Sequence, residues 1–239
     1  MMPMASEHET LIDHINLCLD LLDDHFIKAG VAKNLATLFG TTEEEVSLGL
    51  KATVAFHDYG KAADEYQAKL SFPKHEYYSA AAASLSIRDV CWKTECMTAI
   101  LWHHMAMRGP NFMVDFKSWR KFNAPQTASI SEDFIDAFTD VIDKHGLSTI
   151  LSSKPPSRIS HEEVSNVVDA LYGKVVDISN GIGLYRRSLG FLRPLLIVDN
   201  LAAAFHRGGF HKVFVSDLPN PDEIRRAAQL LKKITALSR

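Results

Sequence analysis

Apolar residues recur every three to four positions through most of the 239-residue chain, which is the spacing that places them on one face of an α-helix. Between residues 7 and 29 the repeating positions are Leu11, Ile15, Cys18, Leu22 and Phe26. The pattern predicts a long first helix with one buried face, which ends near Gly30.

The same periodicity predicts helices along the rest of the chain, at residues 31–39, 43–57, 62–70, 75–85, 92–103, 132–144, 162–176, 184–206 and 222–237. Thr41 or Thr42 is expected to cap the helix that leads to His57, because glutamates follow at the capping-box spacing. Pro194 is expected to kink the helix over 184–206 or to mark its start. Only residues 212–216 have strand character, so the pattern predicts an all-α fold.

The chain shows no strong domain boundary. Residues 108–129 are less regular, with Trp119 and Phe122 as expected apolar anchors. The loop around Pro155 and Pro156 is expected to be exposed, but it is too short to separate two domains. We therefore expect a single domain over residues 1–239, a helical bundle with a core at about 7–206 and a helical C-terminal extension at about 207–239.

Composition and charge narrow the classes of function. The 46% hydrophobic and 23% charged residues are typical of a globular protein, and the formal net charge of −3 argues against coating nucleic acid by a bulk positive field. Local basic patches remain an alternative to solvated helix faces. The candidates are Lys174, Arg186, Arg187 and Arg193, and a C-terminal set of Arg225, Arg226, Lys232 and Lys233.

Several features predict a soluble, cytoplasmic protein without a membrane partner. The three cysteines, Cys18, Cys91 and Cys96, form no CxxC pair and are expected to be reduced core residues. The N-terminus lacks the basic start and apolar run of a signal peptide. The apolar stretch at 192–205 contains charged residues and is too short to span a bilayer.

Histidines and aspartates occur at positions that the helical pattern turns inward. His14 lies on the buried face of the first helix, His57-Asp58 and His103-His104 end two further helices, His75 begins another, and Asp199 interrupts the apolar face of a late helix. Each position has a simple structural alternative. A core histidine can donate to a carbonyl, His75 can lie at the surface, and Asp199 can form a salt bridge.

The set as a whole favours a metal site over these separate alternatives. About one His-Asp dipeptide is expected by chance in a chain with 11 histidines, so His57-Asp58 alone proves little. Imidazole and carboxylate ligands without thiolates suit manganese, iron, cobalt or nickel, with magnesium less favoured. The other histidines, His8, His25, His145, His161, His206 and His211, are interpreted as outside the site.

The order of these residues resembles the HD phosphohydrolase superfamily, whose members hydrolyse phosphate esters on an all-helical scaffold. The closest resemblance is to the HD nuclease domain of the CRISPR-associated "Cas three" family, and it extends from His14 to about Ala204. The sequence signatures are Phe56-His57-Asp58-Tyr59-Gly60-Lys61 followed by Tyr66-Gln67, then Lys74-His75, Ser79-Ala80, Ile100-Leu101-Trp102-His103-His104 and Val198-Asp199-Asn200-Leu201-Ala202. The adjacent His103-His104 pair narrows the resemblance to this family.

Two departures from the family pattern change what the resemblance implies. The chain contains no P-loop pattern, so it resembles the stand-alone, "double-prime" nuclease subunit that needs a separate CRISPR-associated helicase and an RNA-guided surveillance complex. A serine is common in the family shortly after the last aspartate, whereas this chain has alanines at 202–204.

The resemblance also implies roles for single residues. His14, His57, Asp58 and Asp199 would hold one divalent cation, and Asp58 would bridge to a second cation held by His75, His103 and His104. Two such cations activate water for an in-line displacement at phosphorus. Lys61 would be a fixed positive charge beside the phosphate, with a solvated lysine as the alternative.

Three hypotheses of function follow. The first is a metal-dependent DNA nuclease, of endonuclease or exonuclease character, that degrades single-stranded or displaced DNA during CRISPR interference. The second is an HD phosphohydrolase acting on nucleotides or cyclic nucleotides. The third is a catalytically idle domain that binds metal structurally and docks partners. The complete ligand set argues against the third.

Overall fold

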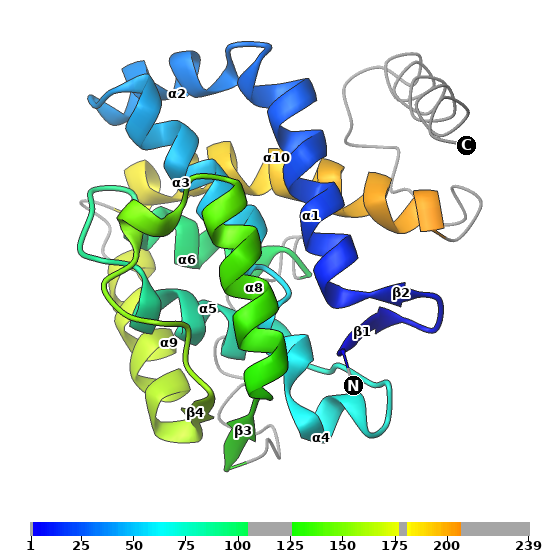
Figure 1. Ribbon diagram of the computed structural model, residues 1–239. Helices are drawn as coiled ribbons and strands as arrows, with labels where there is room; N and C mark the ends of the chain where they lie inside the picture. Colours follow the sequence, from blue (N-terminus) through cyan, green and yellow to red (C-terminus); the bar gives the residue numbers. More distant parts are fainter. Residues whose placement is uncertain (1, 105–125, 177–180, 207–239) are drawn as a thin grey trace, which may run out of the picture.

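Helices account for most of the structure, a computed structural model that describes residues 2–104, 126–176 and 181–206 (Figure 1). The α-helices in this part of the chain are α1 (Leu11–Leu22), α2 (Val31–Phe39), α3 (Glu43–Phe56), α4 (Asp64–Gln67), α5 (His75–Ser86), α6 (Lys93–Trp102), α8 (Glu132–Lys144), α9 (His161–Val176) and α10 (Gly181–His206). The predicted all-α fold is confirmed.

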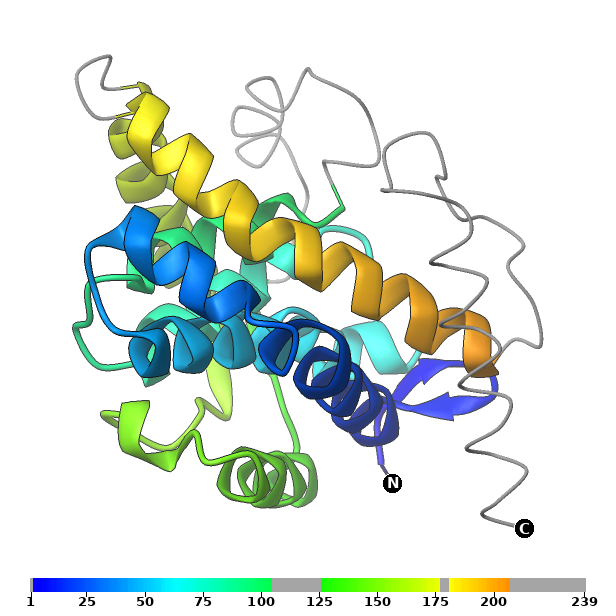
Figure 2. The ribbon, with the colours of Figure 1, turned by 90° about the horizontal axis from the view of Figure 1, so that it is seen from above.

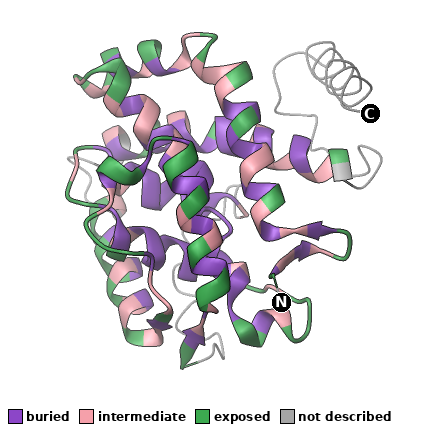
Figure 3. Cartoon of the chain, viewed as in Figure 1, coloured by how far each residue is buried: buried purple, intermediate pink, exposed green. Residues whose placement is uncertain are grey.

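Helix α5 lies at the centre of the bundle. It packs against α3, α6, α9 and the turn before α4, and every residue from His75 to Ala83 is buried. Alanine at positions 80–83 lets these neighbours approach closely, as the sequence predicts. One cluster of buried apolar side chains extends from Ala5 to Ala202, and the exposed residues lie on the outer faces of the surrounding helices (Figure 3).

Helix α1 begins later than the periodicity predicts. Residues Met4–Ser6 (β1) and Glu9–Thr10 (β2) pair as an antiparallel hairpin, so the predicted helical start at residue 7 is wrong. The Thr10 side chain then accepts a hydrogen bond from the Asp13 N–H (3.1 Å) and caps the helix. At the other end the chain continues as a π-helix, Asp23–Ile27, which the 3.6-residue period does not anticipate.

Helices α2 and α3 follow the sequence expectation closely. Helix α2 is bounded by Gly30 and Gly40, both with positive φ. Thr42 is the capping residue of α3, since its side chain accepts from the Glu45 N–H at 3.1 Å. The apolar face of α3 is buried as far as Phe56, which brings the next two residues into the interior.

The predicted helix at 62–70 is largely wrong. The chain forms a 3-10 turn at Tyr59–Ala62, leaves helical geometry at Ala63, and only then forms the single turn of α4. Ala63 is extended because it makes an isolated β-bridge with Ile130. Here a tertiary contact overrides local helix propensity.

Short strands also occur where none is predicted. Besides β1 and β2, strand β3 (Thr127–Ser129) pairs antiparallel with β4 (Arg158–Ser160), with Ala128 opposite Ile159. The prediction that strand character is confined to 212–216 is therefore wrong. Residues 212–216 and 222–237, Trp119 and Phe122 lie outside the described residues, so the predictions made for them, including the extension at 207–239, stay predictions.

Helix α10 runs across the bundle beside α1 and α2 without a break at Pro194, so that proline does not mark its start (Figure 2). Its segment Gly183–Phe205 is long and apolar enough to cross a membrane, in contrast to the shorter stretch considered from the sequence. However, α10 packs against α1, α3, α6 and α9, so its apolar residues contribute to the core.

The cysteines divide between core and surface. Cys18 on α1 and Cys96 on α6 are buried, whereas Cys91, in the loop before α6, is exposed. The expectation that all three are core residues is wrong for Cys91, because the chain between α5 and α6 turns at the surface.

Candidate metal centre

All seven sequence-predicted ligands lie together, contributed by five helices or by the residues that directly follow them. His14 is in the middle of α1, His57 and His103 cap the C-termini of α3 and α6, His75 begins α5 and Asp199 is in α10. Their potential ligand atoms form two groups, each with all atoms within 4.8 Å of one another. The groups are His14, His57, Asp58 and Asp199, called the first set, and Asp58, His75, His103 and His104, called the second set.

The first set has the spacing of ligands around one small cation. His14 Nε2 lies 3.2 Å from Asp199 Oδ1 and 3.7 Å from Asp58 Oδ2. His57 Nε2 lies 3.4 Å from Asp58 Oδ2 and 3.8 Å from Asp199 Oδ1. Metal–ligand bonds of about 2.0–2.1 Å in a tetrahedron place neighbouring ligand atoms about 3.3 Å apart. The observed separations are close to that value.

The second set is formed on the other side of Asp58. His75 Nε2 lies 2.9 Å from Asp58 Oδ1 and 3.2 Å from His104 Nε2, and His103 Nε2 lies 3.7 Å from Asp58 Oδ1. Oδ1 of Asp58 therefore faces the second set while Oδ2 faces the first. The carboxylate is turned toward the histidines, as the predicted bridging role requires.

Hydrogen bonds to the backbone fix the orientation of three imidazole rings. Nδ1–H of His57 donates to the carbonyl of Val54 (2.7 Å), that of His75 to Phe72 (2.7 Å) and that of His103 to Ile100 (2.5 Å). Because a carbonyl only accepts, each Nδ1 carries a proton, and the Nε2 atom of each ring is the one that faces the cluster. This arrangement is usual for histidines that bind metals.

Two of these Nε2 atoms have no hydrogen-bond partner among the described residues. They belong to His57 and His103, and both rings are fully buried. An unpaired polar atom costs about 1–3 kcal/mol in the interior. A cation would satisfy both atoms, so the residues present fit divalent metal ions.

His75 and His104 support the same conclusion. With Nδ1 of His75 already donating, its Nε2 faces a carboxylate oxygen and another ring nitrogen, and this requires a proton or a cation between them. Burial lowers the pKa of His75, and burial together with His103 lowers the pKa of His104. A second proton on His75 or His104 is therefore disfavoured.

In the first set the pKa values of the histidines shift in the opposite direction, upward. Burial opposes protonation of His14 and His57, but neighbouring groups outweigh it. The Cys18 sulfur and Asp199 raise the pKa of His14 well above its usual value, and Asp58 and Asp199 raise the pKa of His57 to about 10. Burial would also favour the neutral carboxyl of Asp58, yet His57 and Lys61 hold its pKa well below its usual range. His14 and His57 lower the pKa of Asp199 in the same way.

Lys61 contacts the cluster directly. Its Nζ donates to Asp58 Oδ2 at 2.6 Å, and its side chain is 15% exposed. The alternative, that Lys61 is a solvated lysine at a helix end, is therefore wrong. Lys61 is held at the edge of the cluster, on the oxygen that faces the first set.

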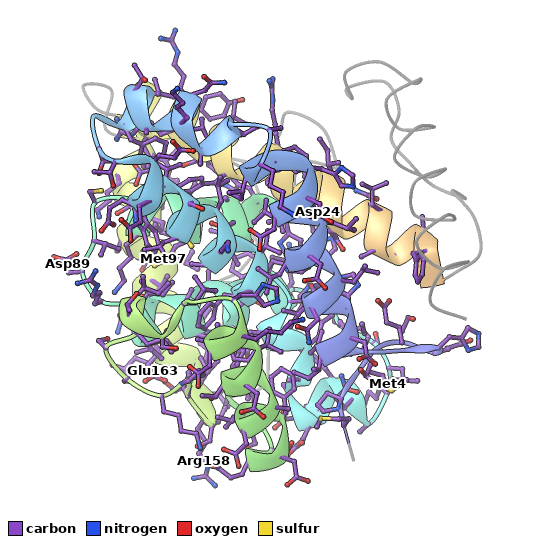
Figure 4. The ribbon with its side chains drawn as sticks, turned by 45° about the horizontal axis from the view of Figure 1, so that its top comes forward. Met4, Asp24, Asp89, Met97, Arg158 and Glu163 are labelled. Atoms are coloured by element: carbon purple, nitrogen blue, oxygen red, sulfur yellow. The ribbon has the colours of Figure 1, made fainter. Side chains whose placement is uncertain are left out.

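The turn after Asp58 is tied to the start of α5. The Gly60 N–H donates to Ser79 Oγ (2.9 Å), and a Cβ on Gly60 would meet the backbone oxygen of His75 at 2.3 Å. Gln67 holds the turn from the other side, because its side chain donates to the carbonyl oxygens of Lys61 (2.7 Å) and Met4 (2.9 Å). Met4, which lies on β1, is labelled in Figure 4. The motif residues Gly60, Gln67 and Ser79 are therefore structural supports.

Two residues that sequence reasoning missed border the first set. Glu9 is buried and its Oε1 lies 3.0 Å from His14 Nδ1, so it fixes that ring. Cys18 Sγ lies 3.6 Å from His14 Nε2. The spacing of four residues between His14 and Cys18 on one helix was the available signal for the cysteine.

The remaining histidines that the structure describes, His8, His25, His145 and His161, belong to neither set. The side chain of His206 and all of His211 lie outside the description. Two residues of the proposed basic patch are engaged with neighbours: Arg187 Nε donates to Glu95 Oε1 (2.7 Å) and Lys174 Nζ to Thr94 Oγ1 (2.9 Å).

Comparison with known proteins identifies the fold. The sequence matches no family model and no curated protein. The structure is similar to the CRISPR-associated Cas3 HD domain protein from Methanocaldococcus jannaschii, with a TM-score of 0.56 and 20% identity, over 82% of this chain and 99% of that one. The chain therefore has the fold of a Cas3-type HD domain.

Proposed function

We propose that this protein is a metal-dependent phosphodiesterase of the HD type that cleaves single-stranded DNA. The observation that carries the proposal is the position of Asp58, whose two oxygens face two separate sets of histidines. Together with the HD-type fold, this favours a centre for two cations over a single structural ion.

The chain's own residues define the chemistry of the site. His14, His57, Asp58 and Asp199 would hold one cation and Asp58, His75, His103 and His104 the other. When bound, two divalent cations would supply an activated water and neutralise the charge that develops on the phosphate. Asp58 would fix the relation between the two sets, and the backbone carbonyls behind the rings would keep each Nε2 in place.

The charge of the cluster suits a phosphate diester. Two carboxylates balance only half the charge of two divalent cations, and the histidines add none when neutral. Lys61 adds one positive charge at the edge of the site. An anionic phosphate would therefore be attracted to the centre although the whole chain is slightly acidic.

The substrate and partners follow from the resemblance and the structural neighbour. The neighbour is CRISPR-associated, which supports a role in type I CRISPR interference on the displaced target strand. In that role the protein would act in the cytoplasm with a separate helicase subunit and an RNA-guided surveillance complex, and without a membrane.

One experiment separates this function from its alternatives. The protein is loaded with manganese, analysed for metal, and incubated with single-stranded DNA, duplex DNA, RNA, nucleotides and cyclic nucleotides. We expect cleavage of single-stranded DNA that Asp58→Ala abolishes. Turnover of a nucleotide without cleavage of any polynucleotide would instead establish the small-molecule phosphohydrolase, and bound metal with no turnover of any substrate would establish an idle domain.

A further inference from the structure

A thiol adjoins the first set, on the side of His14 that faces α10. Cys18 Sγ lies 3.6 Å from His14 Nε2, and these two atoms and a ring nitrogen of His57 are all within 4.8 Å of one another. All three residues are buried. The cluster thus contains a third possible ligand group, which uses no carboxylate.

The position of the thiol follows from the helix. Cys18 is one turn after His14 on α1, so both side chains project from the same face of the helix. The thiol also donates weakly to the carbonyl of Val198 on α10, at 3.7 Å, next to Asp199. That contact keeps the sulfur beside the cluster.

The geometry fits a cation that prefers sulfur. Zinc binds thiolate at about 2.3 Å and imidazole at about 2.0–2.1 Å, so a tetrahedral zinc places the sulfur and nitrogen about 3.6 Å apart. The distance between Cys18 Sγ and His14 Nε2 is 3.6 Å. An independent observation points to a ligand at the same place: the buried Nε2 of His57 has no hydrogen-bond partner among the described residues.

We propose that His14, Cys18 and His57 form a site for a thiophilic divalent cation such as zinc, which excludes a harder cation from the first set. The proposal rests on the metal centre of the proposed function. Binding replaces the S–H bond of Cys18 by a metal–sulfur bond, and it releases the thiol proton and any proton on Nε2 of His14 and His57 to the buffer. Three protein ligands leave a fourth position for water or a carboxylate oxygen.

Zinc at this site would exclude a harder cation from the first set because both cations would use His14 and His57. Once deprotonated, each Nε2 of His14 and His57 has one lone pair and can bind one cation at a time. Manganese or magnesium would use Asp58 and Asp199, whereas zinc or cadmium would favour the sulfur. Zinc would then displace manganese from the first set and leave the second set, which contains no sulfur, available.

The direct test is X-ray absorption of the full-length protein loaded with one equivalent of zinc. We expect a sulfur scatterer at about 2.3 Å together with nitrogen scatterers. Cys18→Ser should lose the sulfur signal, while the exposed-residue control Cys91→Ser should keep it. A spectrum of the unaltered protein with nitrogen and oxygen scatterers alone would overturn the proposal, whether or not Cys18→Ser folds.

Competition provides a second readout that does not depend on catalysis. Loss of a residue that only orients a ligand costs about 10–100-fold in metal affinity, so loss of the sulfur ligand should reduce zinc affinity at least that much. Manganese affinity of Cys18→Ser should stay within about twofold of the unaltered protein. Equal loss for both metals would refute a thiophilic site. An unaltered protein that binds neither metal would instead contradict the proposed metal centre itself.

Discussion

Gly60 lies directly against His75: a Cβ on Gly60 would be 2.3 Å from the His75 backbone oxygen and 3.0 Å from Tyr78 Cβ. The turn that follows Asp58 and the first residue of α5 are thus in contact through a position with no side chain. The absence of a side chain at position 60 allows this close approach, next to Asp58 and His75 of the second set.

Gly60→Ala should therefore separate these ligands. We expect a loss of about 1–3 kcal/mol in the free energy of unfolding, the usual cost of overpacking, and a loss of metal from the second set. Denaturant unfolding and metal analysis measure both. Gly173→Ala on α9 is the control, because nothing lies within 4 Å of its added Cβ. If Gly60→Ala keeps the stability and metal content of the unaltered protein, the close contact between Gly60 and His75 does not matter for the site.

Glu9 should control metal affinity through His14. Its carboxylate oxygen lies 3.0 Å from Nδ1 of His14, so it fixes the ring and strengthens Nε2 as a ligand. Glu9→Gln should weaken binding to the first set by about 10–100-fold. Glu7→Gln, at an exposed position, should have no effect. Calorimetric titration with manganese compares them, and an unchanged affinity in Glu9→Gln would remove Glu9 from the site.

Lys61 should affect catalysis and metal binding in opposite directions. Its Nζ holds Asp58 Oδ2 at 2.6 Å and so competes with a cation for that oxygen. Lys61→Met should bind metal as tightly as the unaltered protein or more tightly. Its kcat/KM on single-stranded DNA should fall about 10–100-fold, the value of one charged hydrogen bond. Lys69→Met, at an exposed position, is the control. Unchanged cleavage in Lys61→Met would leave the lysine with a structural role alone.

The two sets should differ in the protons they release when metal binds. His14 and His57 have raised pKa values, about 10 for His57, so each holds a proton at pH 7 that a cation must displace. His75 and His104 have lowered pKa values and are already neutral. Affinity of the first set should therefore fall as pH falls, while that of the second should change little near neutrality.

Calorimetry in buffers of different ionisation enthalpy counts these protons. His104→Ala isolates the first set and should release about two protons per cation at pH 7. Asp199→Asn weakens the first set and should show release close to zero for the cation that remains. Equal proton release by the two variants would contradict the assigned protonation states.

The candidate ligands could be picked out in the sequence because each lies where helical periodicity or a helix end directs it inward. His14 follows the apolar face of α1, and His57 and His103 end buried faces of α3 and α6. The spatial convergence was not visible in periodicity and came from the resemblance. The structure adds the orientation of the rings, which depends on carbonyls three residues earlier, and the opposite directions in which the two oxygens of Asp58 point.

Other features could not be read from the sequence for physical reasons. Strands β3 and β4 have three residues each, too few to show a period of two. Ala63 is extended because of a partner 67 positions away, Ile130. Cys18 was counted as an apolar core residue, and it is one, but its neighbour is the Nε2 of His14.

The shared position of Asp58 is the central claim, and metal stoichiometry of Asp58→Asn tests it most directly. The substitution keeps the shape of the side chain but removes its charge, so both sets lose an anionic ligand at once. Asp58→Asn should bind neither manganese ion and should not cleave single-stranded DNA, whereas Asp64→Asn, at an exposed position, should keep two ions and full activity. Two ions retained in Asp58→Asn would contradict the account.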